Sequence, residues 1–260
     1  VEVDHLDFYG GGLAEIEDAF TAFAERCDLL VVCADDLPAM RSVAASGRPV
    51  LTYGIDPNAD LRVEIASVGP GGARATLVIE GERHALALGV DGAHNLLNAA
   101  AAVAVAGTVG VEAAVAAGAL AAFTGVHRRF EHRGSVRGAD FYDDYGHVPT
   151  ELEVTLGVAR RTGHRRVVAV FQPHRYSRTQ ALWRELGESL VGADVIVVTD
   201  VYGAAQDPIP GVTIEKGYAI ADLIHNHGQA MVWAGMKEPA ELYWELLRDA
   251  GLTMAPLEQG

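Results

Sequence analysis

Short apolar runs alternate with amphipathic stretches through the second half of the chain, and this alternation restricts the possible folds more than any other feature. RRVVAVF (165–171) and ADVIVVTDVYG (193–203) have the length and composition of buried strands. Between them, SRTQALWRELGESL (177–190) has helical periodicity, with Ser177 as its expected N-cap. Further helices are predicted around residues 215–226 and 238–249. Strands and helices that alternate in this way predict a Rossmann-like, doubly wound α/β sheet.

The first half predicts a different arrangement of strands. DLLVVCA (28–34) and PVLTYG (49–54) flank a short helical stretch that ends at Gly47, which is the order of a parallel strand–helix–strand unit. Three segments separated by glycine-rich turns then predict antiparallel strands, and two alanine-rich stretches predict helices. These are RVEIASV (62–68), ARATLVIE (73–80), RHALALG (83–89), HNLLNAAAAVAVAG (94–107) and VEAAVAAGALAAF (111–123). We place the domain boundary near residues 131–135 and expect domains 1–132 and 133–260.

The charge distribution argues against a general nucleic-acid-binding protein. The formal net charge of the 260 residues is −15, whereas neutralising a phosphate backbone requires a basic surface. Residues 121–190 nevertheless hold 11 of the 20 basic residues, all of them arginine, against 8 acidic ones. This imbalance indicates a local site for phosphate or carboxylate, although solvated helix faces explain Arg160, Arg161, Arg165 and Arg166.

The two cysteines and the apolar runs indicate an intracellular protein. Cys27 and Cys33 lie in or beside an apolar run and predict buried thiols without a disulfide framework. No apolar run reaches the ~18 residues of a membrane span, and the start lacks the basic region of a signal peptide. We therefore expect a cytoplasmic location and no membrane partner. The opening VEVDHLDFYGGG has no initiator methionine, which we interpret as a cut through a longer protein.

Two polar clusters in the first half are candidate binding residues. DHLDFYGG (4–11) places His5 between two carboxylates, and both residue types suit divalent metals, although a histidine in such a stretch is more often structural. His94 and Asn95 open a predicted helix, and Asn98 lies on the same face as Asn95. An asparagine amide can match the hydrogen-bonding edge of adenine. Helix capping is the plainer explanation of Asn95, but it does not explain Asn98.

Three clusters in the second half bring arginine, histidine and carboxylate together. GVHRRFE (125–131) has adjacent arginines, and neighbours in an extended segment point opposite ways, so only one would face a ligand. YDDYGHVPTE (142–151) joins a strand of the alternating series to a helix that opens with a proline, and FQPHRYSRT (171–179) repeats that geometry. Arg175 and Arg178, three residues apart at a helix start, can reach one anion.

Together these motifs resemble the Mur ligases. DHLDFYGG, HNLLNAAAAVAVA, GVHRRFE, DDYGHVPTE and FQPHRYSRT stand in the order and approximate spacing seen in that family, and the match continues to about residue 211. The DDYGH and FQPHRYSRT forms are most similar to the members that join L-alanine to UDP-N-acetylmuramate in peptidoglycan synthesis. The resemblance implies a truncated P-loop-type central domain followed by a Rossmann-like ligase domain, with ATP and Mg²⁺ as cofactors.

The resemblance also implies roles for individual residues. His5 would be a magnesium ligand, Arg129 would touch the phosphates, and Asp144 would hold the ribose and help to set the position of the C-terminal domain. The residues implied beside adenine and ribose are His94, Asn95 and Asn98. The residues implied around the amino acid and the muramyl carboxylate are Tyr145, His174, Arg175 and Arg178. The implied reaction phosphorylates the carboxylate and then lets the amine attack the acyl phosphate.

The sequence also departs from the family pattern. No G-x-x-x-x-G-K-[ST] motif occurs, so the loop that holds the β- and γ-phosphates is absent, and the family carries that loop and its UDP-binding domain upstream of the matched part. His147 is followed by Val148 where the family has two histidines, which leaves the role of His147 open. The tail GLTMAPLEQG lacks a glycine-rich ending. We therefore expect these 260 residues alone not to catalyse ligation.

Two other functions are compatible with the motifs. A recycling ligase that attaches a preformed tripeptide to the same nucleotide sugar would carry similar motifs, although the DDYGH form favours the alanine enzyme. A non-catalytic module that keeps the adenine face would explain the missing phosphate loop, but it has no need of the Arg175 and Arg178 pair. A homodimer is compatible with the sequence.

Overall fold

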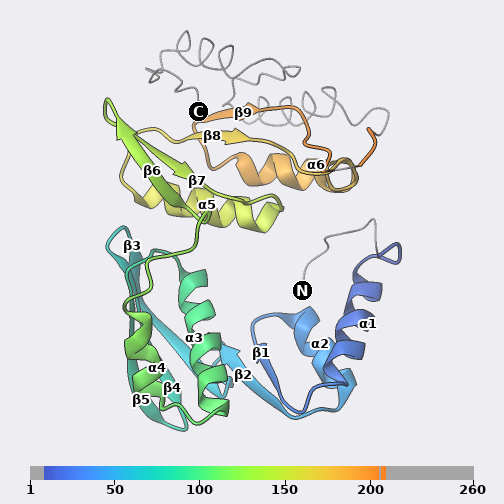
Figure 1. The fold of residues 1–260 in the computed structure, drawn as a ribbon, viewed down its shortest axis with the longest axis vertical. Coiled ribbons are helices and arrows are strands. Elements are labelled where there is room, and N and C mark those ends of the chain that lie inside the picture. Colours follow the sequence, from blue (N-terminus) through green and yellow to red (C-terminus); the bar gives the residue numbers. More distant parts are fainter. Residues whose placement is uncertain (1–8, 205, 209–260) are drawn as a thin grey trace. The chain divides into compact units, whose positions relative to one another are not determined.

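A computed structural model describes residues 9–204 and 206–208, and the chain divides into two compact units between Gly125 and Val126 (Figure 1). The boundary expected from the sequence, between residues 132 and 133, falls inside strand β6 (Glu131–Val136) of the second unit. Both units combine helices with strands, so the mixed α/β class expected from the sequence is confirmed. Within the described ranges, no helix combines the length and the apolar composition that crossing a membrane requires.

The first unit is built on a five-stranded sheet in the order β1-β2-β3-β4-β5. The three leading strands pair in parallel, and the last three pair as antiparallel neighbours, so the two kinds of pairing meet at the middle strand. The strands are β1 (Leu30–Cys33), β2 (Val50–Gly54), β3 (Leu61–Gly69), β4 (Gly72–Ile79) and β5 (Glu82–Leu88). The parallel unit and the antiparallel strands predicted from the sequence are both confirmed.

Four helices accompany this sheet, and the local sequence explains their ends. They are α1 (Leu13–Ala24), α2 (Leu37–Ser46), α3 (Ala93–Thr108) and α4 (Ala113–Leu120). Asp36 caps α2 by accepting a hydrogen bond from the backbone N–H of Ala39 at 2.9 Å. Gly47 ends α2 in the left-handed conformation, with φ 65°, which glycine adopts without steric cost. Helix α1, which packs beside α2, was not predicted from the sequence.

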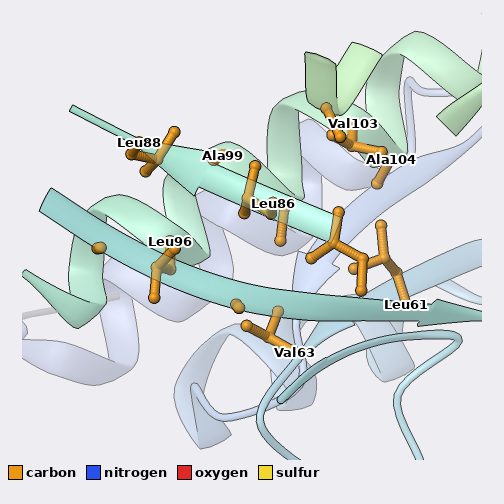
Figure 2. Close-up of a cluster of buried hydrophobic side chains, with 13 residues drawn as sticks. Leu61, Val63, Leu86, Leu88, Leu96, Ala99, Val103 and Ala104 are labelled. Carbon is orange, nitrogen blue, oxygen red and sulfur yellow. The ribbon is translucent and has the colours of Figure 1, made fainter. Parts of the chain in front are cut away.

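Helix α3 packs on the sheet through one continuous apolar stripe. Its buried residues recur at the three- and four-residue spacing of a single helix face. They are Leu96, Ala99, Ala100, Val103 and Ala104. Alternate residues of β3, β4 and β5 form the other side of this core, because successive side chains of a strand point to opposite faces. Figure 2 shows Leu61, Val63, Leu86 and Leu88 of the strands gathered with the α3 side chains. This packing fixes the first turn of α3, which carries the predicted adenine-binding residues, to the sheet.

The second unit contains a hairpin and a separate pair of parallel strands. β6 pairs antiparallel with β7 (Ala139–Asp143), and β8 (Val168–Phe171) pairs in parallel with β9 (Val195–Val198). Helices α5 (Pro149–Arg161) and α6 (Tyr176–Leu190) pack against each other. The core between these elements and the parallel pair consists of Leu152, Leu156, Phe171, Leu186, Leu190, Ala193, Ile196 and Val198.

Three expectations for this unit are corrected. The strand that precedes DDYGH does not join the alternating series, because β7 pairs with β6 in its own sheet. β6 escaped notice because its sequence, EHRGSV, has no apolar alternation. Helix α6 begins one residue before Ser177, and its N-cap is Arg175, with no side-chain cap. Arg160 is more than a solvated side chain, since it donates to the Gly192 carbonyl and pairs with Asp194, both at 2.6 Å. The helices predicted around residues 215–226 and 238–249 lie outside the described residues.

The α3 stripe predicts which substitutions destabilise the first unit. Leu96 is fully buried, so Leu96→Ala removes packed atoms and should lower the free energy of unfolding by about 2–5 kcal/mol. Val105 on the same helix is 51% exposed, and Val105→Ala should change that free energy by no more than about 0.5 kcal/mol. Urea unfolding of both variants measures the difference. Equal effects would contradict the assignment of the buried face.

The first residue of β6 predicts an acid-dependent contribution to stability. Glu131 accepts hydrogen bonds from the Arg128 backbone N–H, from His127 and from Arg133, and these lower its pKa to about 2. Because the folded-state pKa is depressed, the stabilisation is present at neutral pH and is lost as the pH falls from roughly 4.3, the unfolded value, towards 2. Carboxyl NMR titration should give a midpoint near 2, and Arg133→Ala should raise that midpoint. An ordinary glutamate midpoint in the unaltered chain would contradict this network.

Candidate functional site

The N-terminus of α3 holds the three residues predicted to lie beside adenine. Gly92 is its N-cap, with φ 108°, and a Cβ there would come within 2.4 Å of the His94 ring, so only glycine fits. The Asn95 amide donates to the Asp91 carbonyl at 2.7 Å, which ties it to the preceding turn. Asn95 therefore does not cap the helix, and that explanation was wrong. Asn98, one turn further on, is exposed.

The two adjacent arginines lie on a turn and not on an extended segment. Arg128 has φ 58° and Phe130 has φ 46°, both in the left-handed region that non-glycine residues seldom occupy. The Arg128 guanidinium lies 4.5 Å from the centroid of the Tyr145 ring, a cation–π arrangement. Arg129 pairs with Glu151 at 2.9 Å. The expectation of an extended segment is therefore corrected.

Asp144 attaches this turn to the DDYGH segment. One of its carboxylate oxygens accepts the Phe130 backbone N–H at 2.8 Å, and the other accepts the Gly146 N–H at 2.7 Å. The Tyr145 backbone N–H donates to the Arg128 carbonyl at 2.7 Å. The bonds to Phe130 and Arg128 hold the strained turn in place, and the bond to Gly146 braces the segment that carries Tyr145. The carboxylate expected to bind ribose is therefore also a structural clamp.

Glu151 organises the beginning of α5. It is the third residue of the helix, a position from which a glutamate side chain can accept backbone N–H groups ahead of the first turn. Its carboxylate accepts the His147 backbone N–H at 3.0 Å, pairs with Arg129 and lies 3.5 Å from His147 Nδ1. Although burial alone raises the pKa of this carboxyl, the bonds from His147 and Arg129 outweigh it and lower the pKa. Glu151 is therefore ionised at neutral pH.

The N-cap and the first turn of α6 carry the predicted anion-binding arginines, Arg175 and Arg178. Arg175 has φ 71°, and Tyr202 stabilises this conformation because its carbonyl accepts the Arg175 N–H at 2.8 Å. Arg178 is only 5% exposed and donates to the His174 carbonyl at 3.0 Å and to the ring Nδ1 at 3.2 Å. The Gln206 side chain accepts the Ser177 N–H at 3.3 Å at the start of α6.

Rings from three segments meet beside these arginines. The Tyr145 and His147 centroids are 5.1 Å apart, and the His174 ring lies 6.2 Å from Tyr145 and 5.6 Å from His147. Tyr202 continues the group at 5.5 Å from His174. We call these four residues the aromatic cluster. It joins the segments that follow β7, β8 and β9, although β7 belongs to a different sheet.

The structure brings some of the predicted site residues together. The Tyr145 ring lies near the His174 ring, and Arg178 contacts His174. Arg129 lies on the turn that precedes β6, and Asp144 binds the backbone of that turn. His94, Asn95 and Asn98 lie in the first unit. His5 lies outside the described residues. Among the residues that the structure describes, no group of three or more histidine, cysteine, aspartate or glutamate residues is arranged to hold a metal ion.

Sequence reasoning missed three members of this region. Glu151 has a recognisable signal, since it stands three residues after the N-cap of α5, in the position of a capping glutamate. Arg128 was passed over in favour of its neighbour Arg129. Tyr202 gave no signal, because the parallel bridge between His174 and Tyr202 arises only when β8 and β9 pair.

Comparison with known proteins assigns both units to one family. The Mur ligase middle domain matches residues 1–106, and the Mur ligase glutamate ligase domain matches residues 128–250. A UDP-N-acetylmuramate–L-alanine ligase of Clavibacter michiganensis is 42% identical over 256 residues, which are 96% of this chain and 52% of that protein. The chain thus spans about half the length of the curated relatives it matches.

Solved structures agree with this assignment. The UDP-N-acetylmuramate–alanine ligase MurC of Thermotoga maritima gives a TM-score of 0.69 at 29% identity, covering 89% of this chain and 49% of that one. A murein peptide ligase of Psychrobacter arcticus gives 0.65 at 21% identity, with 90% and 49% covered, and this second likeness shows the fold alone. With both domain models matched in order along most of its length, the chain belongs to the Mur ligase family.

Proposed function

We propose that this chain is the catalytic and amino-acid-binding part of an ATP-dependent ligase that joins L-alanine to the lactyl carboxylate of UDP-N-acetylmuramate. The observation that supports the proposal is the meeting of Tyr145, His174 and Arg178 in the unit that matches the glutamate ligase domain. The names of the relatives give the substrates. In this proposal, residues 1–132 belong to the ATP-binding domain and residues 133–260 form the ligase domain.

Residues of the second unit bind and orient the reacting groups. Arg175 and Arg178 stand at the start of α6, where guanidinium groups and the helix dipole both favour a carboxylate. His174 receives two contacts from Arg178, which fixes the ring beside Tyr145. The amino acid and the muramyl carboxylate would lie against this group, and the amine would attack an acyl phosphate formed on that carboxylate.

In the first unit, the start of α3 is the proposed site for the adenine and ribose of the nucleotide. Asn98 is exposed one helical turn from Asn95, which fits an adenine edge, and His94 stands at the same helix start. Arg129 would contact phosphate, for which its pairing with Glu151 would have to loosen. ATP supplies the phosphoryl group. Magnesium is not assigned a step, because His5 lies outside the described residues and the described residues offer no metal-binding group.

The isolated chain should not turn over. The sequence contains no G-x-x-x-x-G-K-[ST] motif, and phosphoryl transfer depends on the backbone N–H groups and lysine of such a loop. An ADP-release assay with UDP-N-acetylmuramate and L-alanine should give no alanine-dependent signal for residues 1–260 alone. Joining the chain to the upstream half of the Clavibacter michiganensis relative should restore the signal. Turnover by residues 1–260 alone would refute the predicted inactivity of the isolated chain. Absence of turnover by the hybrid would refute the proposed ligase activity.

The α6 arginines predict a specific loss of substrate affinity in that hybrid. Arg175→Ala removes one charge-assisted contact of about 1.5–3 kcal/mol, so the KM for the carboxylate substrate should rise roughly 10- to 100-fold. Arg165→Ala, an exposed arginine ahead of β8, is the control and should leave KM within about twofold, because surface substitutions of this kind cost little. Steady-state kinetics of both variants measure the difference, and equal KM values would count against the assignment of Arg175.

Two alternative functions are separated by the choice of amine substrate. A recycling ligase would use a preformed tripeptide in place of L-alanine, so the hybrid should discriminate between the two in the same assay. A nucleotide-sensing module would bind an ATP analogue by calorimetry but show no response to alanine. The 42% identity to an alanine ligase over nearly the whole chain favours the first proposal over both.

A further inference from the structure

We infer that His147 is the general base that removes a proton from the amine substrate, and that Glu151 orients and supports it. The inference rests on the proposed function, because an amino acid arrives as an ammonium group and cannot attack a carbonyl carbon until it loses a proton. The sequence left the role of His147 open. Its hydrogen bonds supply the answer.

The contacts of His147 define which ring nitrogen carries the proton. Nδ1 lies 2.8 Å from the Tyr145 carbonyl oxygen and 3.5 Å from the Glu151 carboxylate. Both partners can only accept, so the proton of the neutral ring is on Nδ1. Nε2 then carries a lone pair, and within the described part of the chain no hydrogen bond engages it. The ring is thus set to accept a proton at Nε2.

Glu151 is suited to stabilise the charged ring that results. Its pKa is lowered, so it is ionised at neutral pH. The His147 backbone N–H donates to the same carboxylate at 3.0 Å, and this bond keeps the Glu151 carboxylate beside the His147 residue. The Tyr145 carbonyl accepts the Nδ1–H, and the Glu151 carboxylate, 3.5 Å from Nδ1, stabilises the imidazolium by its charge.

The base also lies where an amine would be. The groups facing the ring are Tyr145 and Glu151 from its own segment and His174 from the segment after β8. Arg178 contacts His174 and is thus one ring away from His147. An amino acid whose carboxylate met the α6 arginines would therefore extend its amine towards His147. The negative carboxylate end would thus meet the α6 arginines, and the positive ammonium end would meet His147 and the Glu151 carboxylate.

The proposed step balances. Nε2 takes one proton from the substrate ammonium, and the nitrogen lone pair forms the C–N bond to the acyl carbon. The C–O bond to phosphate breaks, the electron pair leaves with the phosphate, and the second amine proton ends on that phosphate. Imidazolium and hydrogen phosphate are the products beside the amide, and the imidazolium returns its proton to solvent.

The first test requires no turnover. Long-range ¹⁵N–¹H NMR of the 260-residue chain, at a pH where the ring is neutral, should place the His147 proton on Nδ1. Glu151→Gln should leave that proton on Nδ1, because the Tyr145 carbonyl still accepts it. A neutral ring protonated on Nε2 could not accept a proton there, and that result alone would overturn the inference.

The second test compares two acceptors in the hybrid ligase. Hydroxylamine is uncharged at neutral pH and traps an acyl phosphate as a hydroxamate without needing a base. His147→Gln should lower kcat for alanine ligation by about 10²–10⁴-fold, the usual contribution of a general base, while hydroxamate formation changes little. The alanine rate of the variant should recover as the pH is raised, because the free amine then forms without help. His132→Gln, a histidine of β6 that contacts Asp140, is the matched control and should behave as the unaltered protein.

These outcomes separate the inference from the function on which it rests. Hydroxamate formed equally by both proteins, with alanine ligation also equal, would exclude His147 as the base while leaving the ligase proposal standing. Loss of both products in His147→Gln would assign the residue to folding or to substrate binding and would also overturn the inference. No hydroxamate from the unaltered hybrid would count against the proposed function, and the NMR result would then decide the proton position independently.

Discussion

The site in the second unit depends on three hydrogen bonds of the DDYGH segment, two of which join it to the turn at residues 126–130. Asp144 accepts two of them, from Phe130 and Gly146, and the Tyr145 N–H donates the third to Arg128. Arg128 and Phe130 have positive φ values, which other interactions must compensate. Without the clamp, the turn would relax, and the directions of both arginines and of Tyr145 would be lost together. A short carboxylate thus determines the positions of longer side chains that it does not touch.

Glu151, like Asp144, makes several contacts through one carboxylate. One carboxylate accepts a backbone N–H at the start of α5, pairs with Arg129 and approaches the His147 ring. Since a cap, an ion pair and a histidine contact share one group, a substitution at Glu151 would alter helix α5, the arginine and the ring at once. The effects of single substitutions in this region should therefore not add, because the residues share partners.

Much of the fold could be predicted because apolar spacing reports local structure directly. The stripe of α3 and the alternation in β3, β4 and β5 are readable by inspection, and both elements occur where the spacing places them. β6 could not be found, because a hairpin strand that is largely exposed has no apolar alternation to reveal it. The prediction that Ser177 caps α6 was wrong for another reason. The pairing of the chain beyond β8 and β9 places Tyr202 against Arg175, and this tertiary contact sets the start of α6. Tyr145 and His174 were predictable as motif residues. Their mutual contact was not, since it joins two sheets.

The two helix starts beside the aromatic cluster differ in the charge that the protein itself supplies. The first turn of α5 is occupied by the Glu151 carboxylate, whereas the first turn of α6 meets the neutral Gln206 amide and carries Arg175 and Arg178. A zwitterion placed between them encounters a polarity: its negative end is repelled at one helix and attracted at the other. For the amino-acid substrate that we propose, only one of the two orientations would therefore be favourable, and the order of acids and arginines along the backbone would select the direction in which it enters.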